Sequence, residues 1–68
     1  MKSWRTDAFS MIKEHPFFID VNNNCIELNR CGNLVFAQAF IKNNLGTKHY
    51  YKFRLSYNLT TREIRETN

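Results

Sequence analysis

Glycine, proline and cysteine are scarce in this chain, which contains two, one and two of them respectively. Two glycines are too few for the glycine-rich loops that cradle phosphates in nucleotide-binding proteins. Two cysteines, Cys25 and Cys31, are too few for a disulfide scaffold. No apolar run approaches the roughly 18 residues that a membrane-spanning helix needs. These absences argue against a nucleotide-binding enzyme, a small disulfide-rich protein and an integral membrane protein.

What the chain does contain is enough apolar surface for one small core. Its 68 residues are 43% hydrophobic and include six Phe, three Tyr and one Trp. Each aromatic side chain removes roughly 150–250 Å² from water when it is buried, so a few of them supply much of a small core. We therefore expect residues 1–68 to form a single domain of modest stability, because a chain this short buries only about 60% of its unfolded surface.

The charge balance is mildly basic, with ten Lys and Arg against six Asp and Glu and a formal net charge of +4. Such an excess favours anionic partners, namely nucleic acid, an acidic protein surface or anionic lipid. The first residues are mixed in polarity and lack the apolar region of a signal peptide. We therefore expect a soluble protein of the reducing cytoplasm. Nine asparagines suit an AT-rich genome of the kind that many bacteria and phages carry.

The first segment has the spacing of an amphipathic helix that ends before Pro16. Ser3 is a suitable N-cap residue, and Pro16 disfavours helical geometry at the residue that precedes it. One face of this helix gathers the apolar side chains of Trp4, Ala8, Met11 and Ile12. We expect this face to pack on a sheet, and a helix lying on a membrane surface is the alternative.

After the proline the pattern changes to short strands separated by turn residues. The clearest strand spans 48–57, where apolar and aromatic residues alternate with polar ones. Further strands are predicted at 17–21, 24–29, 34–42 and 61–66, with asparagine and glycine in several of the connecting turns. The predicted fold class is therefore α+β, with an N-terminal helix packed on one face of a four- to five-stranded antiparallel β-meander.

The alignment of the two central strands decides which side chains meet solvent, because a shift of one residue sends every side chain to the opposite face. If Lys42 pairs with Lys48 across a five-residue loop, each strand delivers its apolar residues to the face that the helix covers. That inner set is Phe17, Ile19, Val21, Ile26, Leu28, Val35, Ala37, Ala39, Ile41, His49, Tyr51, Phe53, Leu55 and Ile64. On the first two strands, the outer face then holds Phe18, Asp20, Cys25 and Glu27.

The outer face of the remaining strands combines aromatic rings with cations, and we predict that it is a binding surface. The predicted binding residues are Phe36, Gln38, Phe40, Tyr50, Lys52, Arg54 and Arg65. The alternative is that the sheet curls, or that two chains dimerise, so that Phe36 and Phe40 become ordinary core residues.

Catalytic and metal-binding chemistry find little support in the residue pattern. Five residues separate Cys25 from Cys31, unlike the close pairs of zinc knuckles, and the two histidines are scattered along the chain. Neither cysteine has a base nearby in the sequence to activate it. Asp20 and Glu27, on a solvated face, are more typical of solubility than of acid–base catalysis. We therefore expect no enzyme activity, no cofactor and no metal.

Size, composition and the predicted surface favour a non-enzymatic regulatory or inhibitory protein of the kind that phages and mobile elements encode. It would act by contacting a larger host or cellular protein through the basic and aromatic face. The alternative is a nucleic-acid-binding module in which Lys52, Arg54 and Arg65 contact phosphates while the rings stack on unpaired bases. No membrane association is expected, and a homodimer is compatible with the pattern.

Overall fold

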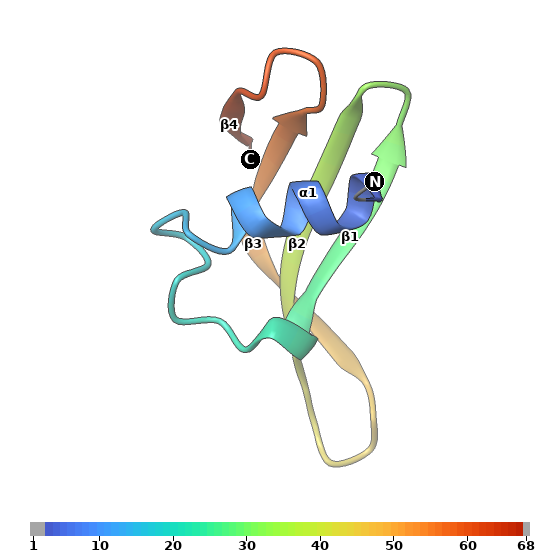
Figure 1. The fold of residues 1–68 in the computed structure, drawn as a ribbon. Helices are drawn as coiled ribbons and strands as arrows, with labels where there is room; N and C mark the ends of the chain where they lie inside the picture. Colours follow the sequence, from blue (N-terminus) through green and yellow to red (C-terminus); the bar gives the residue numbers. More distant parts are fainter. Residues whose placement is uncertain (1–2, 68) are drawn as a thin grey trace.

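The computed structural model describes residues 3–67, which contain one α-helix and a four-stranded antiparallel sheet (Figure 1). The helix is α1 (Trp4–Ile12), and a single 3₁₀ turn, η1 (Asn23–Cys25), precedes the sheet. The strands are β1 (Ile26–Cys31), β2 (Leu34–Lys42), β3 (Lys48–Asn58) and β4 (Ile64–Thr67), in the spatial order β1-β2-β3-β4. Each strand therefore lies beside its neighbour in sequence, which confirms the predicted α+β class and the antiparallel meander.

Helix α1 begins and ends where its local chemistry predicts. The hydroxyl oxygen of Ser3 accepts a hydrogen bond from the backbone N–H of Thr6 at 3.1 Å. At the other end, the N–H of Lys13 donates to the carbonyl of Phe9 at 3.0 Å, shortly before the proline that a helix does not accommodate. Within residues 3–67, no helix is long and apolar enough to cross a membrane.

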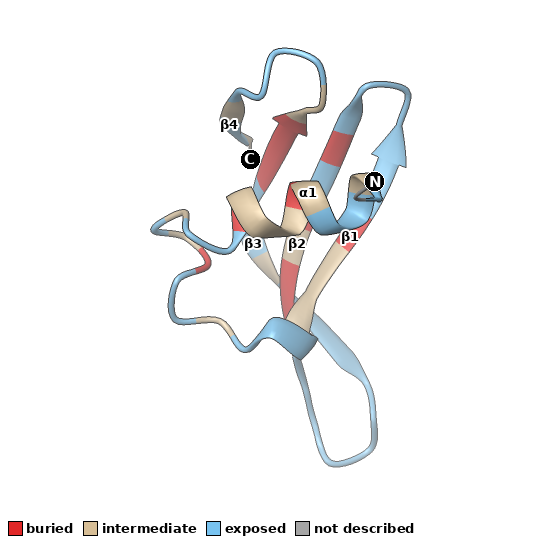
Figure 2. Cartoon of the chain, viewed as in Figure 1, coloured by how far each residue is buried: buried red, intermediate tan, exposed pale blue. Residues whose placement is uncertain are grey.

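The buried core joins α1 to the central strands. Ala8 and Ile12 of α1 are fully buried, as are Leu55 and Tyr57 of β3. Figure 2 shows the buried positions of the sheet concentrated on β2 and β3. The complete buried cluster consists of Ala8, Ile12, Phe18, Leu28, Val35, Ala37, Ala39, Leu55 and Tyr57.

A series of turns follows α1, and the strand predicted at 17–21 is absent. The N–H of Phe18 donates to the carbonyl of His15 at 2.8 Å, and the N–H of Val21 donates to the carbonyl of Phe18 at 3.0 Å. The N–H of Phe17 donates to Nδ1 of His15 at 3.1 Å. Backbone N–H and carbonyl groups that would pair with a neighbouring strand thus form hydrogen bonds within the segment itself. The sheet accordingly has four strands, and the prediction of a fifth was wrong.

The turns also reverse the orientations predicted for Phe18 and Ile19. Phe18 is 1% exposed and belongs to the core, whereas Ile19 is 66% exposed. The ring centroid of Phe18 lies 6.1 Å from that of Phe53 on β3. Both placements were wrong because they depended on the alternation of a strand, which a succession of turns does not follow.

Two of the connections between strands differ in length from those predicted, but the strands present the predicted faces to the core. Two residues, 32–33, join β1 to β2 in place of four, and five residues, 59–63, join β3 to β4 in place of two. In the longer connection, the side-chain oxygen of Asn58 accepts hydrogen bonds from the N–H groups of Thr60 at 2.8 Å and Thr61 at 3.0 Å. Both changes displace the pairing by an even number of residues, so no side chain changes face.

The central hairpin of β2 and β3 contains a bulge. Its loop has the predicted alignment, and near the loop Phe40 faces Tyr50. Farther along, Gln38 faces Arg54, so that three residues of β3 lie opposite the single residue Ala39 of β2. The two extra residues again preserve the predicted faces while they interrupt the ladder and increase the local twist.

Candidate functional site

The candidate site is the face of the sheet opposite the core, which we call the outer face. Because successive side chains of a strand point to opposite sides, the neighbours of the core residues on β2 and β3 point away from the core; these core residues are Val35, Ala37, Ala39, Leu55 and Tyr57. The register across the four strands places the following side chains on the outer face: Glu27, Asn29, Leu34, Phe36, Gln38, Phe40, Tyr50, Arg54, Ser56, Arg65 and Thr67.

Most of the predicted binding residues are exposed on or beside this face. The exposed ones are Phe36, Tyr50, Lys52, Arg54 and Arg65. Gln38 is half-buried, and Phe40, at 6% exposure, is buried. The structure therefore places six of the seven side chains on one face of the sheet, while Lys52 lies in the bulge at the margin of that face.

Phe40 is buried by outer-face neighbours and not by the core. Its ring packs edge-on against Tyr50, with centroids 5.8 Å apart, and Nζ of Lys48 lies 4.7 Å from the centre of its ring. Phe36, by contrast, is 39% exposed. The prediction that both rings meet solvent was therefore wrong for Phe40, because side chains of the neighbouring strand cover it.

A hydrogen-bonded network spans the outer face from β1 to β3. One carboxylate oxygen of Glu27 accepts hydrogen bonds from the hydroxyl of Tyr50 at 2.7 Å and from the ammonium of Lys48 at 3.1 Å. The bond from Tyr50, followed by the bond from Lys48, lowers the pKa of Glu27. The same carboxylate raises the pKa of the Tyr50 hydroxyl. The network holds the ring of Tyr50 in place and compensates the charge of Lys48.

The bulge of β3 is supported from both sides of the sheet. On the outer face, the side-chain amide of Gln38 donates to the backbone carbonyl of Tyr51 at 3.3 Å. On the inner side, the rings of Tyr51 and Phe53 stack with centroids 5.2 Å apart and pack against the core. Lys52, between these two rings in sequence, is exposed. Bulges recur beside functional sites because they change the direction of a side chain, and here the bulge presents a cation.

The cations of this region differ in whether a carboxylate compensates them. Arg65 lies 3.6 Å from the carboxylate of Glu63, and Lys48 is paired with Glu27. Among the residues that the structure describes, no carboxylate forms an ion pair with Lys52 or Arg54. The sequence from 34 to 62 contains no Asp or Glu, so β2, β3 and their connections are cationic.

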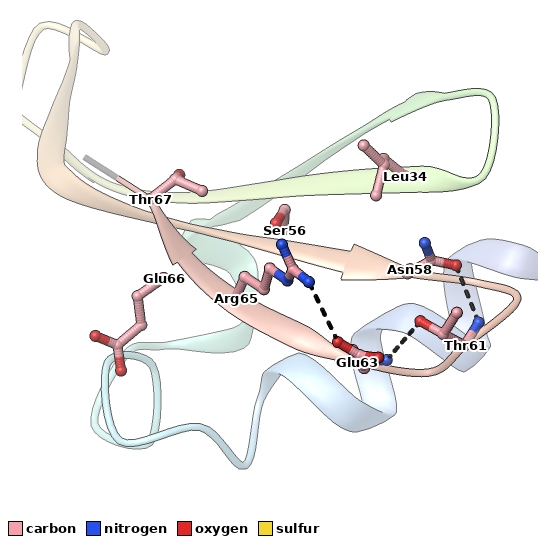
Figure 3. Close-up of a pocket in the computed structure, with 8 residues that line it drawn as sticks. All are labelled: Leu34, Ser56, Asn58, Thr61, Glu63, Arg65, Glu66 and Thr67. Carbon is pink, nitrogen blue, oxygen red and sulfur yellow. Dashed lines mark hydrogen bonds and ion pairs between the residues drawn. The ribbon is translucent and has the colours of Figure 1, made fainter.

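A hollow of about 440 Å³ lies where β4 borders the outer face (Figure 3). Arg65 reaches across it toward Ser56, while the carboxylate of Glu66 points away (Figure 3). The lining residues are Leu34, Ser56, Asn58, Thr61, Glu63, Arg65, Glu66 and Thr67. This lining contains neither a thiol nor an imidazole, and in the described part of the chain no three His, Cys, Asp or Glu side chains gather to hold a metal. The hollow extends the outer face, and most of the residues that line it are polar.

Substitution of the two phenylalanines by serine should separate the exposed ring from the buried one. We expect Phe40→Ser to lower the free energy of unfolding by about 3 kcal/mol, because it removes a buried ring. Phe36→Ser should cost about 1 kcal/mol or less, since much of that ring already meets water. Urea unfolding of both variants and the parent measures the difference, and equal losses would show that Phe36 is also a buried residue.

Glu27 and Lys48 are not among the binding residues predicted from the sequence. Glu27 was expected on the outer face of the first two strands, apart from the basic and aromatic residues, whereas the structure joins it to Tyr50 on β3. One signal in the sequence points to this arrangement. Since no carboxylate occurs from 34 to 62, a counter-charge for Lys48 has to come from outside the central hairpin.

Comparison of the chain with family models, with curated proteins and with solved structures finds no match. What the protein does must therefore be argued from the geometry and charge of the outer face.

Proposed function

We propose that this protein is a non-enzymatic binding protein that attaches to a larger protein through its outer face and thereby regulates or inhibits it. The observation that carries the proposal is the exposure of Leu34, Phe36 and Tyr50 on the sheet face that also holds the uncompensated cation Arg54, with Lys52 at its margin. Apolar side chains exposed together and rimmed by polar ones mark contact surfaces on small proteins. Tyr and Arg are also enriched among the residues that dominate binding energy. The partner surface would be apolar at its centre and acidic at its rim.

The distribution of charge favours a protein partner over nucleic acid. Glu27 lies on the outer face, where its carboxylate would repel a phosphate backbone. It also engages Lys48, which is then not free to contact phosphate. Affinity for nucleic acid grows with the number of phosphates that a protein neutralises. Of the outer-face and bulge cations that the structure describes, Lys42, Lys52 and Arg54 form no ion pair, and three cations supply little of this affinity.

A nucleic-acid-binding module is the second candidate, and the lack of acidic residues from 34 to 62 favours it. A two-stranded β-ribbon fits the major groove of DNA, and exposed rings such as Phe36 stack on unpaired bases. This candidate predicts binding to generic RNA or DNA that weakens steeply as salt rises, because condensed counterions are released. Failure to bind either nucleic acid at low salt would remove it.

Site-specific photo-crosslinking in the native cell tests the proposed function. p-Benzoylphenylalanine at position 36 replaces one exposed ring by another and should yield a discrete product with one larger protein. The matched control carries the same group at Ile19, which is exposed but lies outside the outer face, and should not yield that product.

Each outcome at position 36 decides between the candidates. A product that resists nuclease and contains a single protein supports the proposal. A product that nuclease removes identifies nucleic acid as the partner. The lack of any product, or the same set of products from positions 36 and 19, would reject the outer face as a specific binding surface.

A further inference from the structure

The loop end of the β2–β3 hairpin extends beyond the rest of the sheet. β1 pairs with residues 34–39 of β2, and β4 pairs with residues 54–57 of β3. Among residues 3–67, no strand therefore flanks residues 40–50, which form a two-stranded arm that projects past η1 (Figure 1). The bulge lies where the arm leaves the sheet.

The base of the arm is anchored to the sheet. A two-stranded hairpin is only marginally stable by itself, so a defined arm requires contacts outside its own ladder. Phe40 and Tyr50 pack against one another across the hairpin, and Glu27 of β1 binds the hydroxyl of Tyr50 and the ammonium of Lys48. These contacts tie one strand of the arm to the edge strand of the sheet.

The tip of the arm is also ordered by hydrogen bonds. The side-chain oxygen of Asn43 accepts from the backbone N–H groups of Leu45 and Thr47, both at 2.9 Å. The N–H of Gly46 donates to the carbonyl of Asn43 at 3.0 Å, and Gly46 has the positive φ, 83°, that a tight turn of this kind needs. The loop therefore has a defined shape before any partner binds.

This ordered tip holds an apolar side chain in water. Leu45 is 90% exposed, and every residue from 41 to 50 is exposed (Figure 2). Solvent-exposed Leu45 contributes little to the stability of the fold, since burial is what makes an apolar side chain stabilising. A loop that is already ordered loses less entropy when it binds, so its side chains add more to affinity.

The charged side chains of the arm are all cationic. Lys42 and Lys48 face one another at the base of the loop, and the arm contains no Asp or Glu. Since Glu27 already pairs with Lys48, a surface complementary to this arm has an apolar pocket for the leucine and carboxylates at the border of the pocket for Lys42.

We infer that the arm is a docking element that inserts Leu45 into an apolar pocket bordered by carboxylates on the partner protein. This inference rests on the proposed function, because the partner is the protein that the outer face contacts. Tyr50 belongs to both the outer face and the arm, so a single partner surface can cover the two together.

Photo-crosslinking from the tip tests the inference. p-Benzoylphenylalanine at Leu45 should form a product with the same protein that position 36 captures. Mass spectrometry should place the attached partner residue beside Asp or Glu residues of that protein. The control position is Thr60, which is also exposed but lies in the β3–β4 connection, away from the arm, and it should give no such product.

The results at positions 45 and 36 distinguish the inference from the proposed function. Products at both positions support both. A product at 36 alone overturns the docking role of the arm and leaves the proposed function intact. A product at 45 alone rejects the outer face, and with it the inference that the arm and the outer face bind one partner. No product at either position, or a product at 45 that nuclease removes, overturns the inference.

An affinity measurement with the captured protein gives a second test. Leu45→Ser should weaken binding at least about tenfold, which corresponds to a loss of about 1.4 kcal/mol. Leu45→Met, which keeps an apolar side chain of similar size, should bind like the parent. Unchanged binding of Leu45→Ser, with unfolding midpoints equal for all three proteins, would exclude insertion of this side chain.

Discussion

We expect Phe18→Ala to remove roughly a third or more of the free energy of unfolding of this protein. Removal of a fully buried phenylalanine ring typically costs about 3–5 kcal/mol. A domain of this length has a total stability of only about 3–10 kcal/mol, at roughly 0.05–0.15 kcal/mol per residue. Phe18 is 1% exposed and lies in the cluster that includes buried residues of α1 and the sheet, so its loss removes a large share of the small core.

The adjacent residue provides a matched control. Ile19→Ala should change the free energy of unfolding by no more than about 0.5 kcal/mol, because Ile19 is 66% exposed. Circular dichroism and urea unfolding of both variants measure the contrast. The reverse order, with Ile19→Ala the more damaging change, would indicate that residues 17–21 form a strand after all.

Charge reversal at Lys52 and Arg54 should abolish partner binding without unfolding the protein. We expect Lys52→Glu with Arg54→Glu to weaken binding to the protein captured from position 36 by about 100-fold or more, a loss of about 2.7 kcal/mol. Like charges brought together at an interface cost several kcal/mol, and an acidic partner surface would meet two carboxylates in place of two cations. Both side chains are exposed, so the substitution creates no buried unpaired charge.

A second double variant controls for net charge. Arg5→Glu with Lys13→Glu makes the same change in net charge at exposed positions in and just after α1, outside the outer face. Isothermal titration at two salt concentrations should show this control binding nearly as well as the parent. If both double variants lose affinity equally, the interaction depends on overall charge and not on the outer face.

Much of the fold could be predicted because strand alternation and helix capping depend on residues that are close together in the sequence. Alternation along 48–57 identified the longest strand, and Ser3 with Pro16 bounded the helix. The faces of β2 and β3 were also predictable, since every deviation in pairing proved to be an even number of residues. An even deviation changes which residues are opposite one another but not which of them face the core.

The strand predicted at 17–21 does not form, and low strand propensity is not the reason. A run of apolar residues fits a buried strand and a buried turn equally well, and nothing in the residue order decides between them. Here the backbone of the segment forms its hydrogen bonds within successive turns, one of them through the imidazole of His15. The turns then place Phe18 in the core beside Phe53.

The candidate site shows the same division between local and long-range information. Sequence alone determined the α+β class, the cationic central hairpin and an outer face carrying Phe36, Tyr50 and Arg54, because periodicity and composition act over a few residues. Only the tertiary structure decided that Phe40 is covered, that Glu27 binds Tyr50 and Lys48, and that residues 40–50 project as an arm. Those features depend on where each neighbouring strand stops and on which side chains then meet across it, and contacts between distant residues are not encoded in the pattern of any single segment.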